Sequence, residues 1–303
     1  MYKYTAYSKN ITSDLNIPFL KEVNYSKSDI TIQRNNSVLK FCELKGLDLS
    51  ENKDYFFAEE NSILLSRPGI GIFLINGGDS ITYMNLSKLN IYEFCRFLLN
   101  TCMLFILYQQ DFLVLHGSAV SKNDKVTIFL GNSGSGKSSL AYECAINFKH
   151  NILSEDVIAI KNDKNFSVLP SFQVIKLKKG IQYNNEFEHL SVSRNDRLKR
   201  EMYCIPDKIF ADNDTNQKIK NVVFLEWADE NSLEIIDSTE SFLLFFSNTL
   251  RHIPQSKTPE KEKIALEQIS KIITLAKTYH MKRDLKNVSE ISKKTSEYLK
   301  LIL

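Results

Sequence analysis

The chain has 303 residues, of which 43% are hydrophobic and 25% charged, and its formal net charge at pH 7 is +3. This length is enough for a sizeable core in one or two domains, and the composition is that of an ordinary soluble globular protein. The small net charge gives no argument for a nucleic-acid partner, and the five scattered cysteines contain no CxxC pair that would indicate zinc or a disulfide framework. A reducing cytoplasm is therefore the expected location.

Residues 1 to about 90 are predicted to be rich in β-strands. The opening MYKYTAYSKN lacks the apolar segment and the cleavage site of a signal peptide, so none is expected. Residues 62–84 have the pattern strand, turn, strand, with Asn76-Gly77-Gly78-Asp79 at the tip of a hairpin. We interpret Gly69-Ile70-Gly71 as a turn, because neither a third glycine nor a helix follows it.

A helix that covers this sheet is predicted over residues 90–108. Its most apolar part, FLLNTCMLFILY, is residues 97–108, which is short against the roughly 20 residues that cross a bilayer. Arg96 and Asn100 interrupt the apolar character, so the segment is predicted to be a buried helix, and no membrane partner is expected.

Strands alternate with helices only after residue 110. The segments FLVLHGSAV and KVTIFLG favour two strands joined by the turn residues Ser121-Lys122-Asn123-Asp124, and a glycine-rich loop follows them. Further strands are predicted in NILSEDVIAI and VVFLEW. After the loop, one helical face carries the apolar residues Leu140, Ala141, Cys144, Ala145 and Phe148.

Near the end of the chain, Thr258 is a good N-cap and Pro259 suits the first position of a helix. A helical stripe follows it, made of Ala265, Ile269, Ile272, Ile273 and Ala276. We therefore predict a β-rich N-terminal domain, residues 1–90, and an α/β domain, residues 91–303, with a soft boundary near 90 to 110.

The glycine-rich loop fits the phosphate-binding pattern G-x-x-x-x-G-K-[ST] in full, after an apolar strand and before a helix. Its glycines let the backbone wrap so that N–H groups point at phosphate oxygens, and the helix adds its positive end. Lys137 is expected to reach the β- and γ-phosphates, and the Ser138 hydroxyl to ligate Mg²⁺. The predicted nucleotide-binding residues are Gly131, Asn132, Ser133, Gly134, Ser135, Gly136, Lys137, Ser138 and Ser139.

Two neighbouring acids follow one helix and one strand later. Glu155 and Asp156 stand where a phosphate-loop protein needs an acid to hold magnesium or activate the attacking group. Adjacent residues of a strand point to opposite faces, so different roles are expected for the two. Glu226, which also follows an apolar run, is the rival position. His116 precedes the loop by 21 positions, and from spacing alone a satisfied core histidine is the more ordinary interpretation.

The segments LHGSAV, IFLGNSGSGKSSLA and ILSED, in this order, resemble the catalytic domain of HPr kinase/phosphorylase. They are most similar to the small HPr-kinase-like proteins found beside peptide-tailoring genes, including lasso-peptide kinases. The N-terminal YTAYSKNITSDLNIPFL is similar to the opening pattern of that group, although it lacks the usual glycine. LPSFQVIKLKKG, FLLFFSNTLR and TYHMKRDLKNVSEI look like its later segments.

This resemblance implies an α/β phosphate-loop kinase core that uses ATP and Mg²⁺ to phosphorylate a serine hydroxyl of a peptide or protein. It implies catalytic roles for His116, Lys137, Glu155 and Asp156, with the first acid placed to take the hydroxyl proton, and magnesium at Ser138 and Asp156. This chain has Glu where Asp is usual, and the segment before it is one residue longer, so the division of labour between the acids stays open. The signature of the reverse reaction is not visible, so only kinase activity is expected.

Several alternatives stay open at this point. A small-molecule kinase that acts on a compound such as free serine, and a nucleotide-switched binding module without transfer, both fit the same motifs. Lys176, Lys199 and Arg200 are candidates to meet an acidic group of the acceptor, although a solvated strand end is the favoured interpretation of Lys176. The sequence leaves the acceptor, ATP against GTP, and homo-oligomer formation undecided.

Overall fold

The computed structural model describes residues 1–47, 54–59, 61–84, 91–178, 186–192, 200–211, 217–249, 259–284 and 288–303. The protein is a mixed α/β structure that divides into two compact units. The first unit is Met1–Phe112 with His252–Pro259, and the second is Leu113–Arg251 with Glu260–Leu303. Residues 91–112, expected in the second domain from the sequence, belong to the first unit by their contacts.

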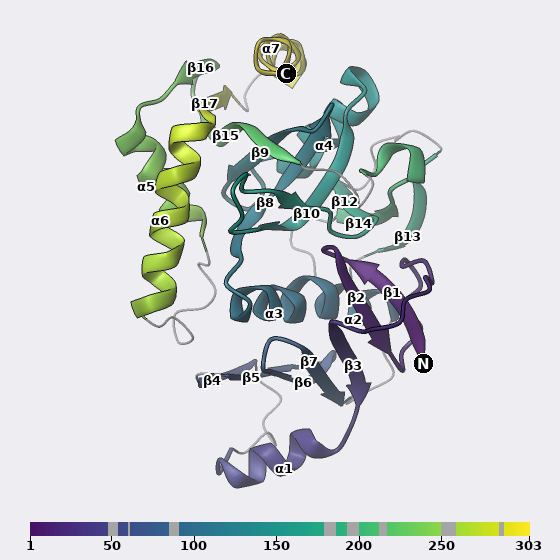
Figure 1. Ribbon diagram of the computed structural model, residues 1–303. Coiled ribbons are helices and arrows are strands. Elements are labelled where there is room, and N and C mark those ends of the chain that lie inside the picture. The colour runs from purple at the N-terminus through teal and green to yellow at the C-terminus, as the bar shows by residue number, and fades with distance from the viewer. Residues whose placement is uncertain are drawn as a thin grey trace. The chain divides into compact units, whose positions relative to one another are not determined.

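The first unit contains a seven-stranded mixed sheet in the order β1-β2-β3-β7-β6-β5-β4 (Figure 1). Its strands are β1 (Tyr2–Ala6), β2 (Lys9–Ser13), β3 (Ile30–Arg34), β4 (Tyr55–Glu59), β5 (Ser62–Arg67), β6 (Gly71–Asn76) and β7 (Ser80–Met84). The pairs β2–β3 and β3–β7 are parallel and the other pairs are antiparallel. The predicted hairpin with its tip at Gly77 and Gly78 is confirmed, since both glycines have positive φ between β6 and β7. The short helix α1 (Ser37–Leu44) also belongs to this unit.

The predicted buried helix is confirmed as one continuous helical segment with a π-helical middle: α2 (Ile91–Phe97), η1 (Leu98–Cys102) and α3 (Met103–Gln109). Phe94 lies 5.4 Å from Phe73 of β6, and Phe105 lies 5.7 Å from Phe56 of β4, measured between ring centroids. By length and composition this helix could cross a membrane, with a mean hydropathy of 1.4, but 61% of that window is buried. Its aromatic contacts with β4 and β6 are those of a helix packed on a sheet.

The second unit is built on a seven-stranded sheet in the order β11-β10-β8-β9-β15-β17-β16. Its strands are β8 (Leu113–Lys122), β9 (Lys125–Gly131), β10 (Asn151–Ile160), β11 (Val168–Leu169), β15 (Lys218–Ala228), β16 (Ser232–Ile235) and β17 (Lys277–Asp284). The three strands β9, β15 and β17 run parallel, whereas β8 is antiparallel to both β9 and β10. The carboxyl ends of β9, β15 and β17 therefore meet at one edge.

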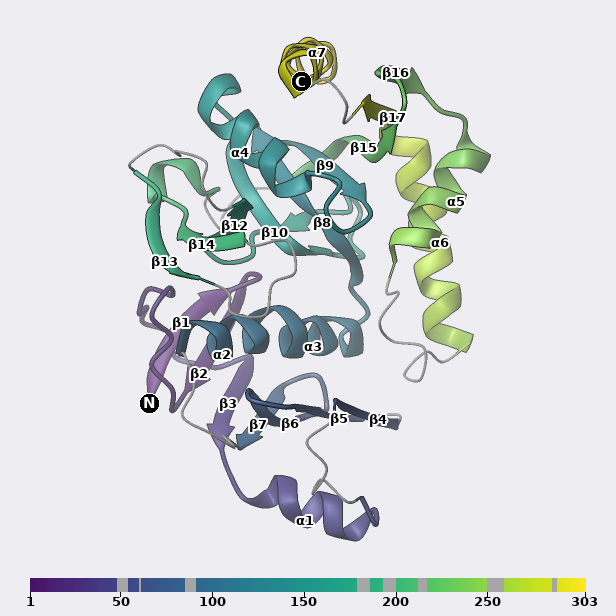
Figure 2. The ribbon, with the colours of Figure 1, turned by 180° about the vertical axis from the view of Figure 1, so that it is seen from behind.

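Helices cover both faces of this sheet (Figure 1 and Figure 2). On one face α5 (Ser238–Asn248) and α6 (Pro259–Leu275) pack against Ile128 and Leu130 of β9. On the other, α4 (Lys137–Phe148) and α7 (Val288–Ile302) pack against Phe129. The alternation along β9 follows the two-residue period of a strand.

A second, three-stranded sheet lies against α4. It contains β12 (Val174–Lys178), β13 (Glu188–Val192) and β14 (Arg200–Cys204) in the order β12-β14-β13, and the short 3-10 helix η2 (Asp207–Ile209) follows it. Ile175 and Leu177 of β12 share an apolar cluster with Ala145 of α4. This contact holds β12 beside the helix that begins at the glycine-rich loop.

One predicted boundary differs in detail. The turn between β8 and β9 is only Asn123-Asp124, both with positive φ of 50° and 61°, as the tight turn of a two-residue hairpin requires. Thr258 lies outside the described residues, while α6 begins at Pro259. The helical stripe of α6 is confirmed, because Ile269 and Ile272 are fully buried.

Candidate active site

The glycine-rich loop connects the end of β9 with the first turn of α4, as the sequence predicted. Gly131, Gly134 and Gly136 have φ of 142°, 84° and 88°, a region that other residues rarely adopt. A Cβ atom on Gly131 would lie 2.5 Å from the carbonyl oxygen of Leu225. The glycines are therefore required both for the backbone conformation and for the close approach of β15.

The loop keeps backbone donors available. Within the described part of the chain, the N–H groups of Gly134 and Gly136 donate no hydrogen bond, whereas the Ser135 N–H donates to the carbonyl of Asn132 at 3.0 Å. Donors of this kind at a helix N-terminus suit an anion.

Lys137 folds across the loop. Its Nζ donates to the carbonyl oxygens of Gly131, at 3.0 Å, and Asn132, at 3.1 Å. Burial lowers the pKa of this lysine, and the nearby carboxylates of Asp156 and Glu155 oppose that shift. The only hydrogen bonds described for this ammonium are to two neutral carbonyls, which it can exchange for phosphate oxygens.

Three side chains that the sequence analysis did not identify brace the loop from outside. The Gly131 N–H donates to Oδ1 of Asn248 at 3.1 Å, and Nε1 of Trp227 donates to the Gly134 carbonyl at 3.0 Å. A guanidinium nitrogen of Arg283 donates to the carbonyl of Ser135. Trp227 lies near the carboxyl end of β15, which pairs with β9, and Arg283 lies near the carboxyl end of β17, which pairs with β15. Polar or aromatic residues at those two strand ends are the signal that could have found them.

Glu155 and Asp156 lie on β10, beside β8. Glu155 pairs in register with Ser118, and Asp156 pairs with Gly117. Asp156 has a positive φ of 62°, so the strand alternation that predicted opposite faces is interrupted at this residue.

Glu155 is a buried acid, only 3% exposed. Neither carboxylate oxygen has a well-formed hydrogen bond within the described residues, although the hydroxyls of Ser118 and Ser138 approach them. Burial and the charge of Asp156 raise the pKa of Glu155 to about 7, while the two hydroxyls act in the lowering direction. The Glu155 carboxylate has therefore lost its hydration on burial, and protein hydrogen bonds do not fully replace it.

Asp156 has a different environment. Its Oδ2 lies 2.6 Å from Nζ of Lys176 on β12, and the two side chains are 15% and 11% exposed. The interpretation of Lys176 as a solvated strand end is therefore wrong. Nδ1 of His116 lies 2.9 Å from the backbone oxygen of Asp156. Desolvation lowers the pKa of His116, although its ring still reaches solvent, and the charge of Asp156 opposes this shift.

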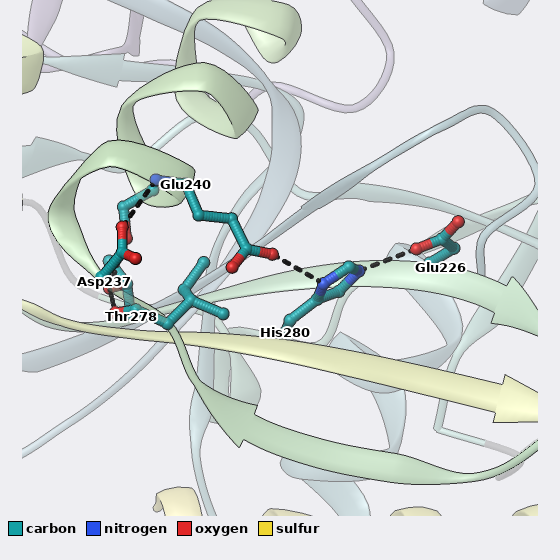
Figure 3. Close-up of polar contacts among 7 residues, drawn as sticks. Glu226, Asp237, Glu240, Thr278 and His280 are labelled. Carbon is teal, nitrogen blue, oxygen red and sulfur yellow. Dashed lines mark hydrogen bonds and ion pairs between the residues drawn. The ribbon is translucent and has the colours of Figure 1, made fainter.

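The rival acid Glu226 is engaged elsewhere. Its Oε2 lies 2.9 Å from Nε2 of His280, and Nδ1 of the same histidine lies 3.3 Å from Oε1 of Glu240 (Figure 3). Glu226 thus belongs to a polar cluster between β15, β17 and α5. Of the other candidates for acceptor contact, Arg200 begins β14 and Lys199 lies outside the described residues.

The residues at the loop fit a magnesium ion. Mg²⁺ prefers oxygen ligands and is usually held by one or two carboxylates together with phosphates and water. The buried Glu155 carboxylate, without a full hydrogen bond and beside the Ser138 hydroxyl, offers such oxygens. The described residues contain no group of three or more His, Cys, Asp or Glu that could bind a metal without phosphate.

Comparison with known proteins adds little to this geometry. No family model matches the chain, and no curated protein matches it either. Among solved structures, it is similar to the Hpr(Ser) kinase/phosphatase from Coxiella burnetii, with 10% sequence identity over 62% of this chain and 96% of that chain. The TM-score is 0.28, and a likeness this loose carries no argument about the fold or the function.

Proposed function

We propose that the protein is an ATP-dependent kinase of the HPr-kinase type that transfers the γ-phosphate to a serine hydroxyl of a peptide or protein. One observation carries this proposal. A glycine-rich loop with available N–H donors stands beside two adjacent carboxylates, Glu155 and Asp156, whose environments differ sharply. Neighbouring carboxylates in environments that differ in this way are typical of divided roles in catalysis.

The loop and Lys137 would hold the phosphates. The N–H groups of Gly134 and Gly136 and the N-terminal end of α4 stabilise negative charge, and Lys137 would move from its two carbonyl partners to phosphate oxygens. Because phosphoryl transfer depends mainly on positioning and electrostatics, this cradle would supply most of the catalysis.

Magnesium would be held by Ser138 and Glu155. Asp156 is the metal ligand expected from the sequence together with Ser138, but the carboxylate that approaches the Ser138 hydroxyl is that of Glu155. When bound, Mg²⁺ supplies positive charge that neutralises the phosphates. Glu155 must be ionised to act as a ligand, and its pKa of about 7 means that metal and proton would compete for it near neutral pH.

Asp156 would act as the general base. The acceptor oxygen forms a bond with the γ-phosphorus, the bond from that phosphorus to ADP breaks, and the hydroxyl proton passes to the Asp156 carboxylate. Nζ of Lys176 lies 2.6 Å from the Asp156 carboxylate, and His116 contacts the backbone oxygen of Asp156 and helps to orient it. General-base catalysis of this kind contributes about 10²- to 10⁴-fold.

The acceptor class rests on the sequence resemblance. We propose a serine of a ribosomally made precursor peptide, modified in the cytoplasm, with the reaction running in the kinase direction only. Lys176 and Arg200 border the site on β12 and β14, where an acceptor would approach Asp156.

The test is transfer of radiolabelled phosphate from [γ-³²P]ATP with Mg²⁺. Acceptors are the peptides encoded next to the gene, a panel of serine-containing proteins, and free serine. We expect label on a peptide or protein serine, lost in Lys137→Met and in Asp156→Asn, with circular dichroism showing that both variants are folded. The charge change of Lys137→Met is matched by the control variant Lys277→Met at the exposed start of β17.

The other outcomes of this assay would indicate a different function or contradict the proposed role of the loop. Label on free serine alone would indicate a small-molecule kinase. Saturable nucleotide binding without transfer to any acceptor, together with tolerance of Asp156→Asn, would indicate a nucleotide-switched binding module. Full transfer by a folded Lys137→Met protein would contradict the proposed role of the loop.

A further inference from the structure

Arg283 is a buried cation behind the phosphate loop. Its side chain belongs to β17 and the residue is only 4% exposed. Burial lowers its pKa to about 10, so it is still charged at neutral pH. No carboxylate pairs with it within the described residues, and its Nε has no hydrogen-bond partner there. Burial of a charge without an ionic partner is unfavourable. We therefore expect Arg283 to have a function that offsets this free-energy cost.

The contacts of this guanidinium lie on the loop and on Trp227. One nitrogen donates to the Ser135 carbonyl, and the guanidinium carbon lies 4.4 Å from the centre of the Trp227 ring, a cation–π geometry. Trp227 in turn donates its indole N–H to the Gly134 carbonyl at 3.0 Å. The carbonyls of Gly134 and Ser135 therefore accept hydrogen bonds from the stacked side chains of Trp227 and Arg283. These two residues lie side by side because they pair in register between β15 and β17.

These contacts set the direction of the loop's donors. In a planar trans peptide, the carbonyl of one residue and the N–H of the next point to opposite sides. Because Arg283 donates to the Ser135 carbonyl, the N–H of Gly136 points away from the guanidinium. A cation on the carbonyl also polarises that peptide, which makes its N–H a stronger donor. A Cβ atom on Gly136 would lie 3.1 Å from the guanidinium, so the contact also depends on glycine at this position.

We propose that Arg283 and Trp227 form a clamp that presets the loop for phosphate, and that Arg283 is a positioning residue for nucleotide binding. The inference rests on the proposed function, since it requires a nucleotide phosphate in the loop. The negative charge of a bound triphosphate would compensate the buried guanidinium from the other side of the loop. Arg283 would then favour the nucleotide-bound protein over the free one.

The protein carries its own reporter for this test, because Trp227 is the single tryptophan of the chain. Titration with MgATP should change its fluorescence to saturation in the wild type. We expect Arg283→Met to weaken the affinity at least about tenfold, as expected when a charged hydrogen bond is lost. Arg283→Lys keeps the charge but lacks the planar guanidinium, so its affinity should lie between those of the wild type and Arg283→Met. Lys277→Met, which removes an exposed charge from the same strand, should stay within about twofold of the wild type.

Thermal unfolding distinguishes an arginine that promotes nucleotide binding from one that only stabilises the fold. Without nucleotide, we expect Arg283→Met to melt at or above the wild-type temperature, because a buried charge without an ionic partner is removed. The same variant should lose most of the rise in melting temperature that MgATP gives the wild type. If Arg283→Met does not fold, Arg283→Gln replaces it. Trp227→Phe, which keeps a ring for stacking but lacks the N–H, should also bind more weakly by calorimetry.

The outcomes distinguish this inference from the proposed function. Nucleotide affinity within twofold of the wild type in a folded Arg283→Met or Arg283→Gln protein would overturn the clamp. A large fall in the melting temperature of the free variant, with the nucleotide-induced rise intact, would also overturn it. Absence of MgATP binding by the wild type would overturn both proposals. Binding with the expected dependence on Arg283, but without phosphate transfer, would overturn the kinase and leave the clamp supported.

Discussion

At the scale of single residues, the two neighbouring acids are the most informative feature. Glu155 is buried without a full hydrogen bond, whereas Asp156 is paired with Lys176 at 2.6 Å. A buried acid without a partner destabilises the fold when it ionises, and an acid paired with a lysine stabilises it. Neutralising Glu155 is therefore expected to raise the free energy of unfolding, whereas neutralising Asp156 is expected to lower it.

We expect Glu155→Gln to stabilise the free protein at alkaline pH. The folded-state pKa of Glu155, about 7, is above its ordinary value of 4.5. The wild type should therefore lose stability as pH rises from about 4.5 to 7, with the full penalty above 7. Urea denaturation without metal or nucleotide should give the variant an advantage near zero at pH 4.5 and about 3 kcal/mol at pH 8.5.

Asp156→Asn is the matched control for this measurement. It leaves Lys176 with an uncharged neighbour in a largely buried site, so it should lower the free energy of unfolding at pH 8.5. Equal destabilisation by both variants at that pH would contradict the contrast between the two acids.

At the scale of elements, the strands β8, β9 and β10 place His116, the loop and the acids together. Gly117 of β8 allows the close packing of this region, because a Cβ atom there would lie 2.6 Å from the carbonyl oxygen of Phe129 and 2.7 Å from Cδ1 of Ile158. The backbone of β9 cannot move away without breaking its pairing with β8.

Gly117→Ala should therefore lower the free energy of unfolding by about 2 kcal/mol or more, because it overfills a packed sheet. It should also reduce nucleotide affinity, since it displaces the strand that leads into the loop. Asn151→Ala, at the exposed start of β10, should change stability by less than about 0.5 kcal/mol. Thermal denaturation of both variants checks this, and a Gly117→Ala protein as stable as the wild type would contradict the packing argument.

Most of these elements could be predicted from the sequence. The apolar alternation of β9, the glycines after it and the apolar face of α4 are local patterns, and local patterns survive folding well. The brace from Trp227, Asn248 and Arg283 could not be predicted, because it depends on the tertiary arrangement that places β15 beside β9, β17 beside β15, and α5 on one face of the sheet. The environment of Lys176 was misjudged for the same reason: its pairing with Asp156 arises only when β12 packs beside β10.

At the scale of the whole molecule, the chain divides into two compact units by its contacts, and this division falls at another position than the change in sequence pattern. A sequence boundary near residue 90 follows the change from strands to a helix, whereas the contacts divide the chain at Phe112. The helical segment from Ile91 to Gln109 belongs to the first unit because its aromatic rings pack on β4 and β6. A helix at a boundary carries no local signal of the sheet on which it packs.

All the residues of the candidate site lie in the second unit, at the edge where β9, β15 and β17 end and β10 passes α4. Binding of a triphosphate at this edge is the central claim, since the roles of magnesium, the base and the clamp all depend on it.

Calorimetric titration of the whole chain with MgATP measures that binding most directly. We expect one saturable site with a dissociation constant below about 1 mM, in the range usual for enzyme substrates, and a loss of at least about tenfold in Lys137→Met. No saturable heat at several times that concentration, or equal affinity in the folded Lys137→Met protein, would contradict it.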